Sequence, residues 1–387
     1  MPGVMTQMAC CCEYRHHGSD SFRLVSSLAI RMDAGLSSIN YFFDSGKFIS
    51  VLFRGELVHK RLIGPMEVSA IGFGCMSISH AYGPALEKAE AQKVLHKALD
   101  IGHTLLDTAA LYGFGANEEL IGETLSQRRN EYKLASKCGL FKNTEGKRAI
   151  DGRPEVIKKT CEDSLRRLQT DFIDLYYLHR LDKNVPIEES VGALSELVSE
   201  GKIGHIGLSE VSAQTLRKAH AVHPISALQN EYSLLSRNPE IASLEACKEL
   251  GVALVAFSPV SRGVLTDEPV LPGQFPPGDI RPNMPRFQGE AYEHNLSLLD
   301  GYIVIAEKAG CSRAQLALAW LLARGEHVIP IPGTTSIAHM EENFGAGDIK
   351  LDAEIVQELD QHINQNTVQG ERYNAATMAE IDTENFE

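Results

Sequence analysis

The chain has 387 residues, of which 43% are hydrophobic and 23% are charged, a composition typical of globular domains and unlike that of disordered or collagen-like chains. It holds 37 basic and 51 acidic residues, and the formal net charge of -14 argues against nonspecific binding to nucleic acids or anionic membranes. Eight cysteines are too few for a disulfide scaffold, and no run of about 20 apolar residues predicts a transmembrane helix.

Residues 1–55 differ from the rest of the chain, because they are slightly basic and have no sustained helical or strand period. We expect a poorly ordered extension; the alternative is an organellar transit segment, since arginine and serine are present and acids are few. No apolar segment follows a basic start as in a secretory signal, so a cytoplasmic location is expected. The run Cys10–Cys12 and the pair His16–His17 match no zinc-ligand spacing, and no metal site is predicted.

From residue 56 onward, short apolar runs alternate with amphipathic helical segments. The segment 57–68 is expected to form a β-hairpin. The predicted strands are 68–75, 103–107, 133–137, 172–179, 203–209, 225–229, 252–257 and 328–333. The predicted helices are 89–101, 117–128, 154–169, 187–200, 213–221, 240–250, 292–309 and 312–324. Asn117 is expected to cap the helix that it begins.

Eight strand–helix units are typical of either a closed (β/α)8 barrel or a doubly wound open sheet. The strand ends favour the barrel, because nearly every run finishes at a polar or small side chain, and a barrel draws its site from many strand ends. These residues are Cys75, Asp107, Lys137, His179, Ser209, Gln229, Ser258 and Thr334. We therefore predict an α/β fold, a (β/α)8 TIM barrel over residues 56–387, with an N-terminal β-hairpin floor.

The sequence Gly72-Phe73-Gly74 follows a predicted strand but does not satisfy the dinucleotide-binding fingerprint. Ser77 stands where that motif requires its third glycine, and Asp107 lies well beyond the expected acidic position. We interpret the glycines as a tight strand-end turn that lets the backbone approach a ligand.

Asp107, Lys137 and His179 end three consecutive predicted strands, and Tyr112 lies five residues after Asp107. A buried lysine is costly unless it is paired, and Asp107 on the neighbouring strand would supply the partner. The pair alone would be explained by a structural role in bracing the barrel. The four residues together favour a catalytic site.

At these residues the sequence resembles the aldo-keto reductases, nearest to members described as pyridoxal reductase-like or auxin-induced-protein-like. The resemblance covers about residues 58–375. It is carried by LLDTAALYG (105–113), LASKCG (134–139), DLYYLHR (174–180), GLSE (207–210), LQNEYS (228–233), FSPVSRG (257–263), IPGTTSIAHMEEN (331–343) and the tail GERYNAATM (370–378).

The resemblance implies a catalytic tetrad of Asp107, Tyr112, Lys137 and His179 in an NAD(P)H-dependent alcohol:NADP+ oxidoreductase. Tyr112 would be the general acid that protonates the carbonyl oxygen as hydride reaches the carbon. Lys137 would lower the pKa of Tyr112, and Asp107 would orient the lysine. His179 would donate a hydrogen bond to the developing alkoxide.

The resemblance also implies NADP(H) across the barrel mouth, with Ser209 and Gln229 on the carboxamide, Phe257 stacked on the nicotinamide and Arg262 on the pyrophosphate. The full set of implied cofactor residues is Gly74, Cys75, Met76, Ser209, Gln229, Phe257, Ser258, Pro259, Val260, Arg262, Gly263, Gly333, Thr334, Thr335, Ser336, His339, Glu342 and Asn343.

Two positions depart from the family pattern. Glu210 stands where many members have Asn, although close relatives also have Glu at this position. The adenosine loop has Thr335, Ser336 and His339 where Lys or Arg is usual, so the preference for NADP(H) over NAD(H) is expected to be modest.

The substrate is expected to be a small carbonyl compound, selected by the loops 77–86, 139–153 and 266–288 and by the tail after residue 365. The alternative function, which the tetrad leaves open, is a cofactor-binding, redox-sensing subunit of a membrane channel with little turnover.

Overall fold

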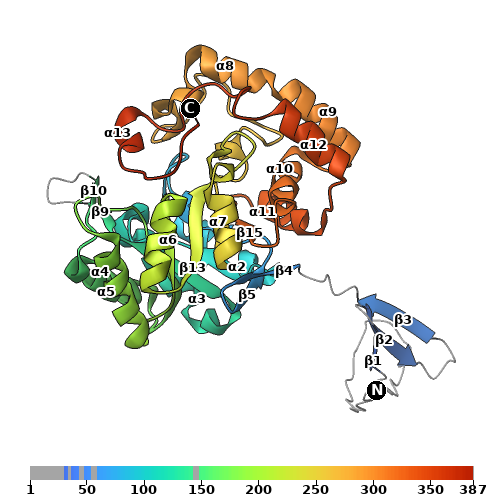
Figure 1. The fold of residues 1–387 in the computed structure, drawn as a ribbon. Coiled ribbons are helices and arrows are strands. Elements are labelled where there is room, and N and C mark those ends of the chain that lie inside the picture. The colour runs from blue at the N-terminus through green and yellow to red at the C-terminus, as the bar shows by residue number, and fades with distance from the viewer. Residues whose placement is uncertain (1–29, 34–35, 43–47, 54–58, 143–147, 387) are drawn as a thin grey trace. The chain divides into compact units, whose positions relative to one another are not determined.

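The computed structural model describes residues 30–33, 36–42, 48–53, 59–142 and 148–386, and the chain divides into two compact units, Met1–Val58 and His59–Glu387. In the first unit, strands β1 (Ile30–Asp33), β2 (Leu36–Phe42) and β3 (Phe48–Phe53) form an antiparallel sheet (Figure 1). The sequence pattern did not indicate these strands. Residues 10–12 and 16–17, considered above as metal ligands, lie outside the described residues.

The second unit is built on eight parallel strands. In chain order they are β6 (Phe73–Gly74), β7 (Leu105–Asp107), β8 (Lys133–Cys138), β11 (Ile173–Leu178), β12 (Ile203–Ser209), β13 (Ile225–Glu231), β14 (Ala253–Phe257) and β15 (Val328–Pro330). Each strand pairs with the next, and backbone hydrogen bonds from Gly72 N to Pro330 O (3.0 Å) and from Gly74 N to Pro332 O (3.1 Å) join the two end strands. The predicted (β/α)8 barrel is therefore confirmed.

Glycines make this closing seam of the barrel possible. A Cβ atom on Gly74 would lie 2.8 Å from Ile331 O, and one on Gly333 would lie 2.6 Å from Gly74 O, closer than real contacts allow. The interpretation of Gly72 and Gly74 as a turn approached by a ligand was thus incomplete, because their backbone is approached by the neighbouring strand.

Most helices lie in the predicted segments, with boundaries shifted by a few residues, but the single helix predicted over 292–309 is two helices, and those over 76–79, 353–362 and 375–378 were not predicted. The helices are α1 (Met76–Ser79), α2 (Lys88–Asp100), α3 (Ala116–Leu125), α4 (Pro154–Leu168), α5 (Ile187–Ser199), α6 (Ala213–Val222), α7 (Ser243–Leu250), α8 (Gly289–Ser297), α9 (Leu299–Ala309), α10 (Arg313–Leu322), α11 (Ile337–Gly345), α12 (Ala353–His362) and α13 (Ala375–Met378). Local chemistry fixes several ends: Ser312 and Gln315 form a capping box at the start of α10, and Gly251 ends α7 in the left-handed conformation. Within the described ranges, no helix is long and apolar enough to span a bilayer.

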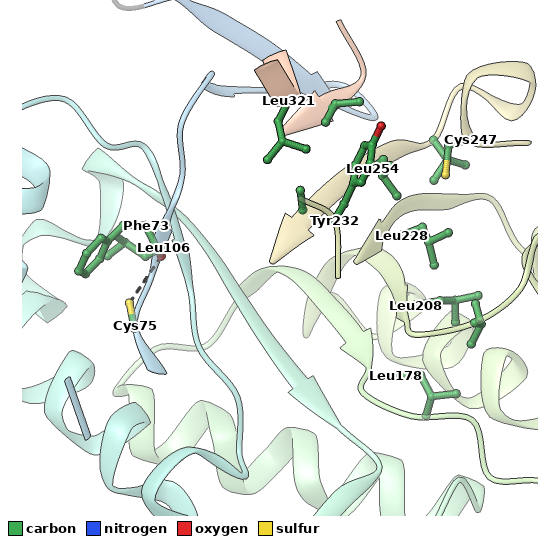
Figure 2. Close-up of a cluster of buried hydrophobic side chains, with 14 of the residues drawn as sticks. Phe73, Cys75, Leu106, Leu178, Leu208, Leu228, Tyr232, Cys247, Leu254 and Leu321 are labelled. Carbon is green, nitrogen blue, oxygen red and sulfur yellow. Dashed lines mark hydrogen bonds between the residues drawn. The ribbon is translucent and has the colours of Figure 1, made fainter. Parts of the chain in front are cut away.

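The hydrophobic core has two layers, inside and outside the barrel. The predicted hairpin forms from β4 (Lys60–Ile63) and β5 (Met66–Ser69), and its apolar side chains pack against the barrel interior. The interior cluster is Ile63, Met66, Val68, Leu105, Ala135, Leu175, Tyr177, Ala227, Ala253, Val255, Ile329 and Ile331. Figure 2 shows alternate residues of the strands, such as Leu178, Leu208 and Leu228, in the outer cluster. Burying each such leucine stabilises the fold by about 1.5–3 kcal/mol, so both layers hold the strand ends in place.

Candidate active site

A cavity of about 990 Å³ lies over the carboxyl ends of the barrel strands. All four segments that the sequence assigned to the mouth contribute to its wall: the loop after β6, the hairpin of β9 (Leu140–Lys142) and β10 (Arg148–Ile150), the long 266–288 loop and the C-terminal tail. A volume near 1,000 Å³ is at the upper end for small-molecule and cofactor sites. The cavity is therefore large enough for a cofactor with a small substrate.

Asp107, Tyr112 and Lys137 form one buried, hydrogen-bonded group at the base of this cavity. The Lys137 ammonium contacts Asp107 Oδ1, lies 2.8 Å from Thr108 O and lies 3.2 Å from the Tyr112 hydroxyl. Lys137 is fully buried, whereas Asp107 and Tyr112 also line the cavity. The structure thus brings together the strand-end residues as the sequence predicted, with Tyr112 between the lysine and the open space.

The charges in this group set its protonation states. Burial lowers the pKa of Lys137, but Asp107 and Tyr112 outweigh burial and raise it overall, so the lysine is charged at neutral pH. Burial likewise raises the pKa of Tyr112, and the Lys137 cation opposes it without cancelling it. The expected direction of the lysine's influence is confirmed, but the expectation that the pKa of Tyr112 falls below its ordinary value is wrong for the protein without ligands, because desolvation of the phenolate dominates.

His179 follows β11 and lines the same cavity, with its ring 6.0 Å from that of Tyr112 and nearly perpendicular to it. Burial, reinforced by the nearby Arg180 and Lys137 cations, lowers the pKa of His179 well below its ordinary value, so the imidazole is neutral at pH 7. Its Nδ1 atom is buried and has no hydrogen-bond partner among the described residues. A neutral histidine in this place is a hydrogen-bond donor or acceptor rather than a proton source.

Asn117 braces the group from behind. The Thr108 hydroxyl donates to Asn117 Oδ1 (2.6 Å), and the amide of Asn117 donates to Cys75 O (2.9 Å) and Ser79 Oγ (2.7 Å). The prediction that Asn117 caps a helix is wrong, because α3 begins one residue earlier and Asn117 points into the protein. Asn117 instead connects two loops by hydrogen bonds. One carries Thr108, whose carbonyl accepts from Lys137, and the other begins at Cys75 and forms part of the cavity wall.

Most of the residues that the resemblance implied for a cofactor line the cavity together. They are Gly74, Met76, Ser209, Gln229, Phe257, Ser258, Pro259, Val260, Arg262, Gly263, Gly333, Thr334, Thr335, His339, Glu342 and Asn343. Gln229 also donates to Asp107 Oδ2 (2.8 Å), which links the expected carboxamide site to the buried pair.

Two expected cofactor residues do not line the cavity. The side chain of Cys75 belongs to the outer hydrophobic core, because α1 begins there and turns the thiol away from the mouth. Ser336 is the N-cap of α11, and its hydroxyl accepts from His339 N (3.4 Å). Ser336 therefore caps the N-terminus of α11, and the exposed His339 lies in the first turn of that helix.

The loop after β14 has an unusual backbone. Ser258, Ser261 and Arg262 have φ angles of 52°, 53° and 56°, in the left-handed region that side-chain-bearing residues rarely adopt. Successive turns of this kind form concave backbone sites for anions. The Arg262 guanidinium itself is bound to Glu231 (2.8 Å) and to the Tyr373 hydroxyl (3.0 Å), so its contact with a pyrophosphate stays a prediction.

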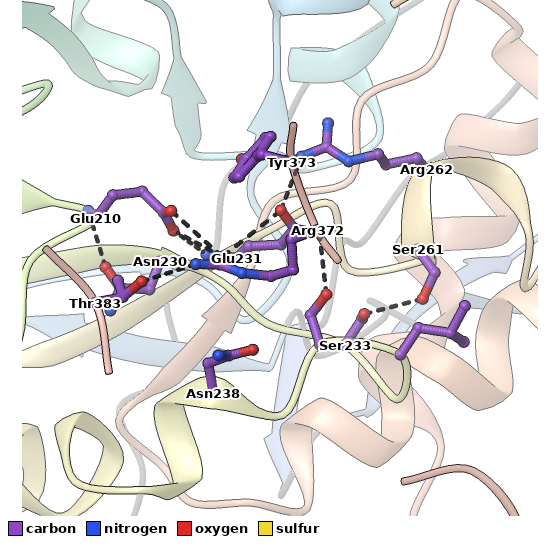
Figure 3. A network of polar contacts seen from close by, with 12 residues as sticks. Glu210, Asn230, Glu231, Ser233, Asn238, Ser261, Arg262, Arg372, Tyr373 and Thr383 are labelled. Atoms are coloured by element: carbon purple, nitrogen blue, oxygen red, sulfur yellow. Dashed lines mark hydrogen bonds and ion pairs between the residues drawn. The ribbon is translucent and has the colours of Figure 1, made fainter. Parts of the chain in front are cut away.

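A buried ionic network joins the C-terminal tail to the strand ends beneath the cavity (Figure 3). Arg372 of the tail lies 3.3 Å from Glu210 and 3.7 Å from Glu231, and its guanidinium also donates to Thr383 (2.7 Å). Burial raises the pKa of Glu231, but Arg262 and the other arginines outweigh it and lower the pKa to about 2. The network places Tyr373 in the cavity wall, so the tail is part of the site.

Sequence reasoning missed most charged residues of the wall. Arg148, Arg180 and Arg281 line the cavity and were not predicted as site residues. The signal for Arg180 was its place directly after His179 in the strand-end motif. Arg148 begins the short strand β10 and Arg281 begins a three-residue 3-10 turn, and elements this short show no periodicity that indicates which side chains face inward.

Comparisons with known proteins agree on one family. A family model described as the aldo/keto reductase family matches residues 70–364. A curated relative from Schizosaccharomyces pombe, named aldo-keto reductase yakc NADP(+), is 46% identical over 319 residues, covering 81% of this chain and 94% of the relative. The solved glycerol dehydrogenase AKR11B4 from Gluconobacter oxydans is 30% identical with a TM-score of 0.73, covering 82% of this chain and 99% of its own. The holo form of aldo-keto reductase AKR11C1 from Bacillus halodurans is also 30% identical, with a TM-score of 0.67 and the same coverage.

Proposed function

Because this chain belongs to the aldo/keto reductase family, we propose that it is an oxidoreductase that uses NADP(H) to reduce aldehydes or ketones to alcohols. The observation that carries the proposal is the Tyr112 hydroxyl at the cavity wall, 3.2 Å from the ammonium of a buried lysine. This is the arrangement expected of a phenol that gives up a proton to a bound carbonyl and is stabilised as phenolate afterwards.

The residues of the cavity fit a nicotinamide dinucleotide. Ser209 and Gln229 offer hydrogen-bonding side chains near the buried pair, the loop 258–263 offers a concave backbone, and the N-terminal end of α11 offers backbone N–H groups suited to a phosphate. When bound, the cofactor would supply the hydride, so that NADPH becomes NADP+ as the carbonyl becomes an alcohol.

The residues of the tetrad would then divide the remaining chemistry. Tyr112 donates its proton to the carbonyl oxygen as that oxygen gains negative charge. Lys137 stabilises the phenolate that remains, and Asp107 keeps the lysine charged and oriented. His179, being neutral, donates a hydrogen bond to the same oxygen without competing as the acid.

The preference between the two nicotinamide cofactors should be modest. The wall segment 333–343 has no lysine or arginine, and its contribution to a 2′-phosphate would come from hydroxyls, backbone N–H groups and His339. The name of the yeast relative contains NADP(+), which supports NADP(H) as the main cofactor here; NAD(H) stays open.

Steady-state oxidation of NADPH with a panel of aldehydes, including pyridoxal and 4-nitrobenzaldehyde, tests the proposal. We expect turnover on the order of 1–10³ per second with a good substrate, as for most enzymes. A redox-sensing channel subunit would bind NADPH with equal ease but oxidise it hardly at all with any aldehyde, which would overturn the enzymatic proposal. The cytoplasmic location stays a prediction, which cell fractionation would test.

A further inference from the structure

The arginines of the cavity wall differ in whether their charge is balanced. Arg148 contacts Glu380, Arg262 lies 2.8 Å from Glu231, and Arg281 lies 2.6 Å from Asp279. Among the described residues, no carboxylate lies within 4.0 Å of the Arg180 guanidinium. Arg180 is thus the cavity-lining arginine whose charge has no partner in the part of the chain that the structure describes.

Arg180 is also deeply buried, with 7% of its surface exposed. Its Nη1 atom donates to its neighbour's carbonyl, His179 O (2.7 Å), and lies 3.4 Å from Ser209 Oγ, while Nε is buried and has no hydrogen-bond partner among the described residues. Taking a charge out of water without a counter-ion is expensive, and arginine cannot escape the cost by losing its proton. An anion brought by a ligand would offset that cost.

The position of Arg180 indicates which ligand carries the anion. Arg180 follows β11, whereas the concave loop 258–263 follows β14, and β12 and β13 separate these two strands in the barrel. The pyrophosphate proposed for that loop would therefore lie on another part of the rim. Arg180 instead adjoins His179; its charge adds to the lowering of the His179 pKa by burial and opposes the rise that burial causes in the pKa of Tyr112. It is beside the groups that would hold the reacting carbonyl.

We propose that Arg180 binds a carboxylate or phosphate group of the carbonyl substrate, so that this enzyme favours anionic aldehydes over neutral ones of the same shape. The proposal rests on the reductase function proposed above. A guanidinium presents parallel N–H donors that match either anion in a bidentate pair. Arg180 would thereby orient the substrate with its carbonyl toward Tyr112 and His179.

The test uses the full chain with NADPH and two aldehydes that differ in charge, 4-carboxybenzaldehyde and 4-nitrobenzaldehyde. Arg180→Met should raise KM for the carboxylate by about 10- to 100-fold, the range for a hydrogen bond to a charged group. It should change KM for the nitro compound less than about threefold and leave the dissociation constant of NADPH unchanged, because Arg180 is assigned to the substrate. Pyridoxal and pyridoxal 5′-phosphate form a second pair that distinguishes phosphate from carboxylate recognition.

Arg148→Met is the matched control, since it removes another arginine from the same wall whose charge Glu380 already balances. It should leave the ratio of the two KM values within about threefold of wild type. Arg180→Lys should recover part of the carboxylate preference, because it restores the charge without the fork. Equal increases in KM for both benzaldehydes in Arg180→Met, or a weakened NADPH complex, would overturn the proposal and make Arg180 a positioning residue for Ser209.

Should Arg180→Met fail to fold, the wild-type protein still decides the matter. Benzoate should compete with 4-nitrobenzaldehyde at least about tenfold more tightly than the neutral benzamide, and equal inhibition would overturn the proposal. If wild type reduces no aldehyde, the reductase function fails separately, and calorimetric titration of benzoate and benzamide into the protein with NADP+ tests the anion site alone.

Discussion

Replacing Lys137 with methionine should weaken both the fold and the reaction, because this lysine holds together three buried groups. Its ammonium contacts Asp107, lies 2.8 Å from Thr108 O and lies 3.2 Å from the Tyr112 hydroxyl. Methionine has a similar length but no charge and no donor. The substitution therefore leaves Asp107 buried with the Gln229 amide, at 2.8 Å, as its remaining side-chain partner in the described part of the chain.

The size of the effect follows from burial. Removing one member of a buried ion pair costs about 3–5 kcal/mol, since the other charge stays out of water. The neutral amide of Gln229 compensates in part, so we expect a loss near the lower limit, about 3 kcal/mol. Adding Asp107→Asn removes the stranded charge, and the double variant should recover about 1–2 kcal/mol relative to Lys137→Met alone.

Urea unfolding of wild type, both single variants and the double variant measures this coupling. Lys133→Met is the matched control on the same strand, because Lys133 lies 3.3 Å from Asp174 at the outer end and its side chain is 43% exposed. It should cost at most about 1 kcal/mol and leave the reduction of 4-nitrobenzaldehyde unchanged. Lys137→Met should slow that reduction by about 10²–10⁴-fold, because the pKa of Tyr112 rises further without the cation.

Two results would refute this reasoning. If the double variant unfolds at the same urea concentration as Lys137→Met, the two residues are not energetically coupled. If Lys137→Met keeps the wild-type rate, the lysine has no part in the proton transfer.

The remaining predictions concern the ionic network of the C-terminal tail, the adenosine loop and the N-terminal extension, which we call the leader. The pKa of Glu231, about 2, lies below its unfolded value, so its ionised form stabilises the fold by about 3 kcal/mol above pH 5, and this contribution disappears as pH falls from about 4.5 toward 2. Glu231→Gln should therefore cost more at pH 7 than at pH 3 in urea unfolding, and a cost independent of pH would contradict the network. His339→Arg should tighten NADPH by about 1–3 kcal/mol and leave NADH unchanged, as measured by fluorescence quenching; an equal gain for both would place residue 339 away from the 2′-phosphate. We further propose that the barrel folds without the leader, so a chain beginning at His59 should reduce aldehydes at the wild-type rate, and an insoluble or inactive product would refute it.

The sequence was sufficient for the barrel because its periodic signals are local. Alternating apolar runs and amphipathic helices indicate each unit separately, and parallel strands that end at one rim bring Asp107, Lys137 and His179 together without further information. The same logic located the four segments that surround the cavity, since such segments connect predicted strands and helices.

The sequence was insufficient where the outcome depends on which charges meet after folding. Glu210 and Glu231 meet Arg372, which is more than 140 residues later in the chain, and no periodicity encodes that contact. The pKa of Tyr112 likewise depends on the balance between burial and one cation, and the sequence indicated the cation but not the burial. Helices α1, α12 and α13 were missed, and α1 and α13, with four residues each, are too short to show a helical period.

The central claim, that Tyr112 is the proton donor of a carbonyl reductase, is tested most directly by Tyr112→Phe. The substitution removes one hydroxyl at the cavity wall and keeps the ring that packs beside His179. We predict that kcat for 4-nitrobenzaldehyde falls by at least about 10²-fold, while the dissociation constant of NADPH stays at the wild-type value. A variant that retains more than about a tenth of the wild-type kcat would contradict the account, because another group would then be protonating the carbonyl oxygen.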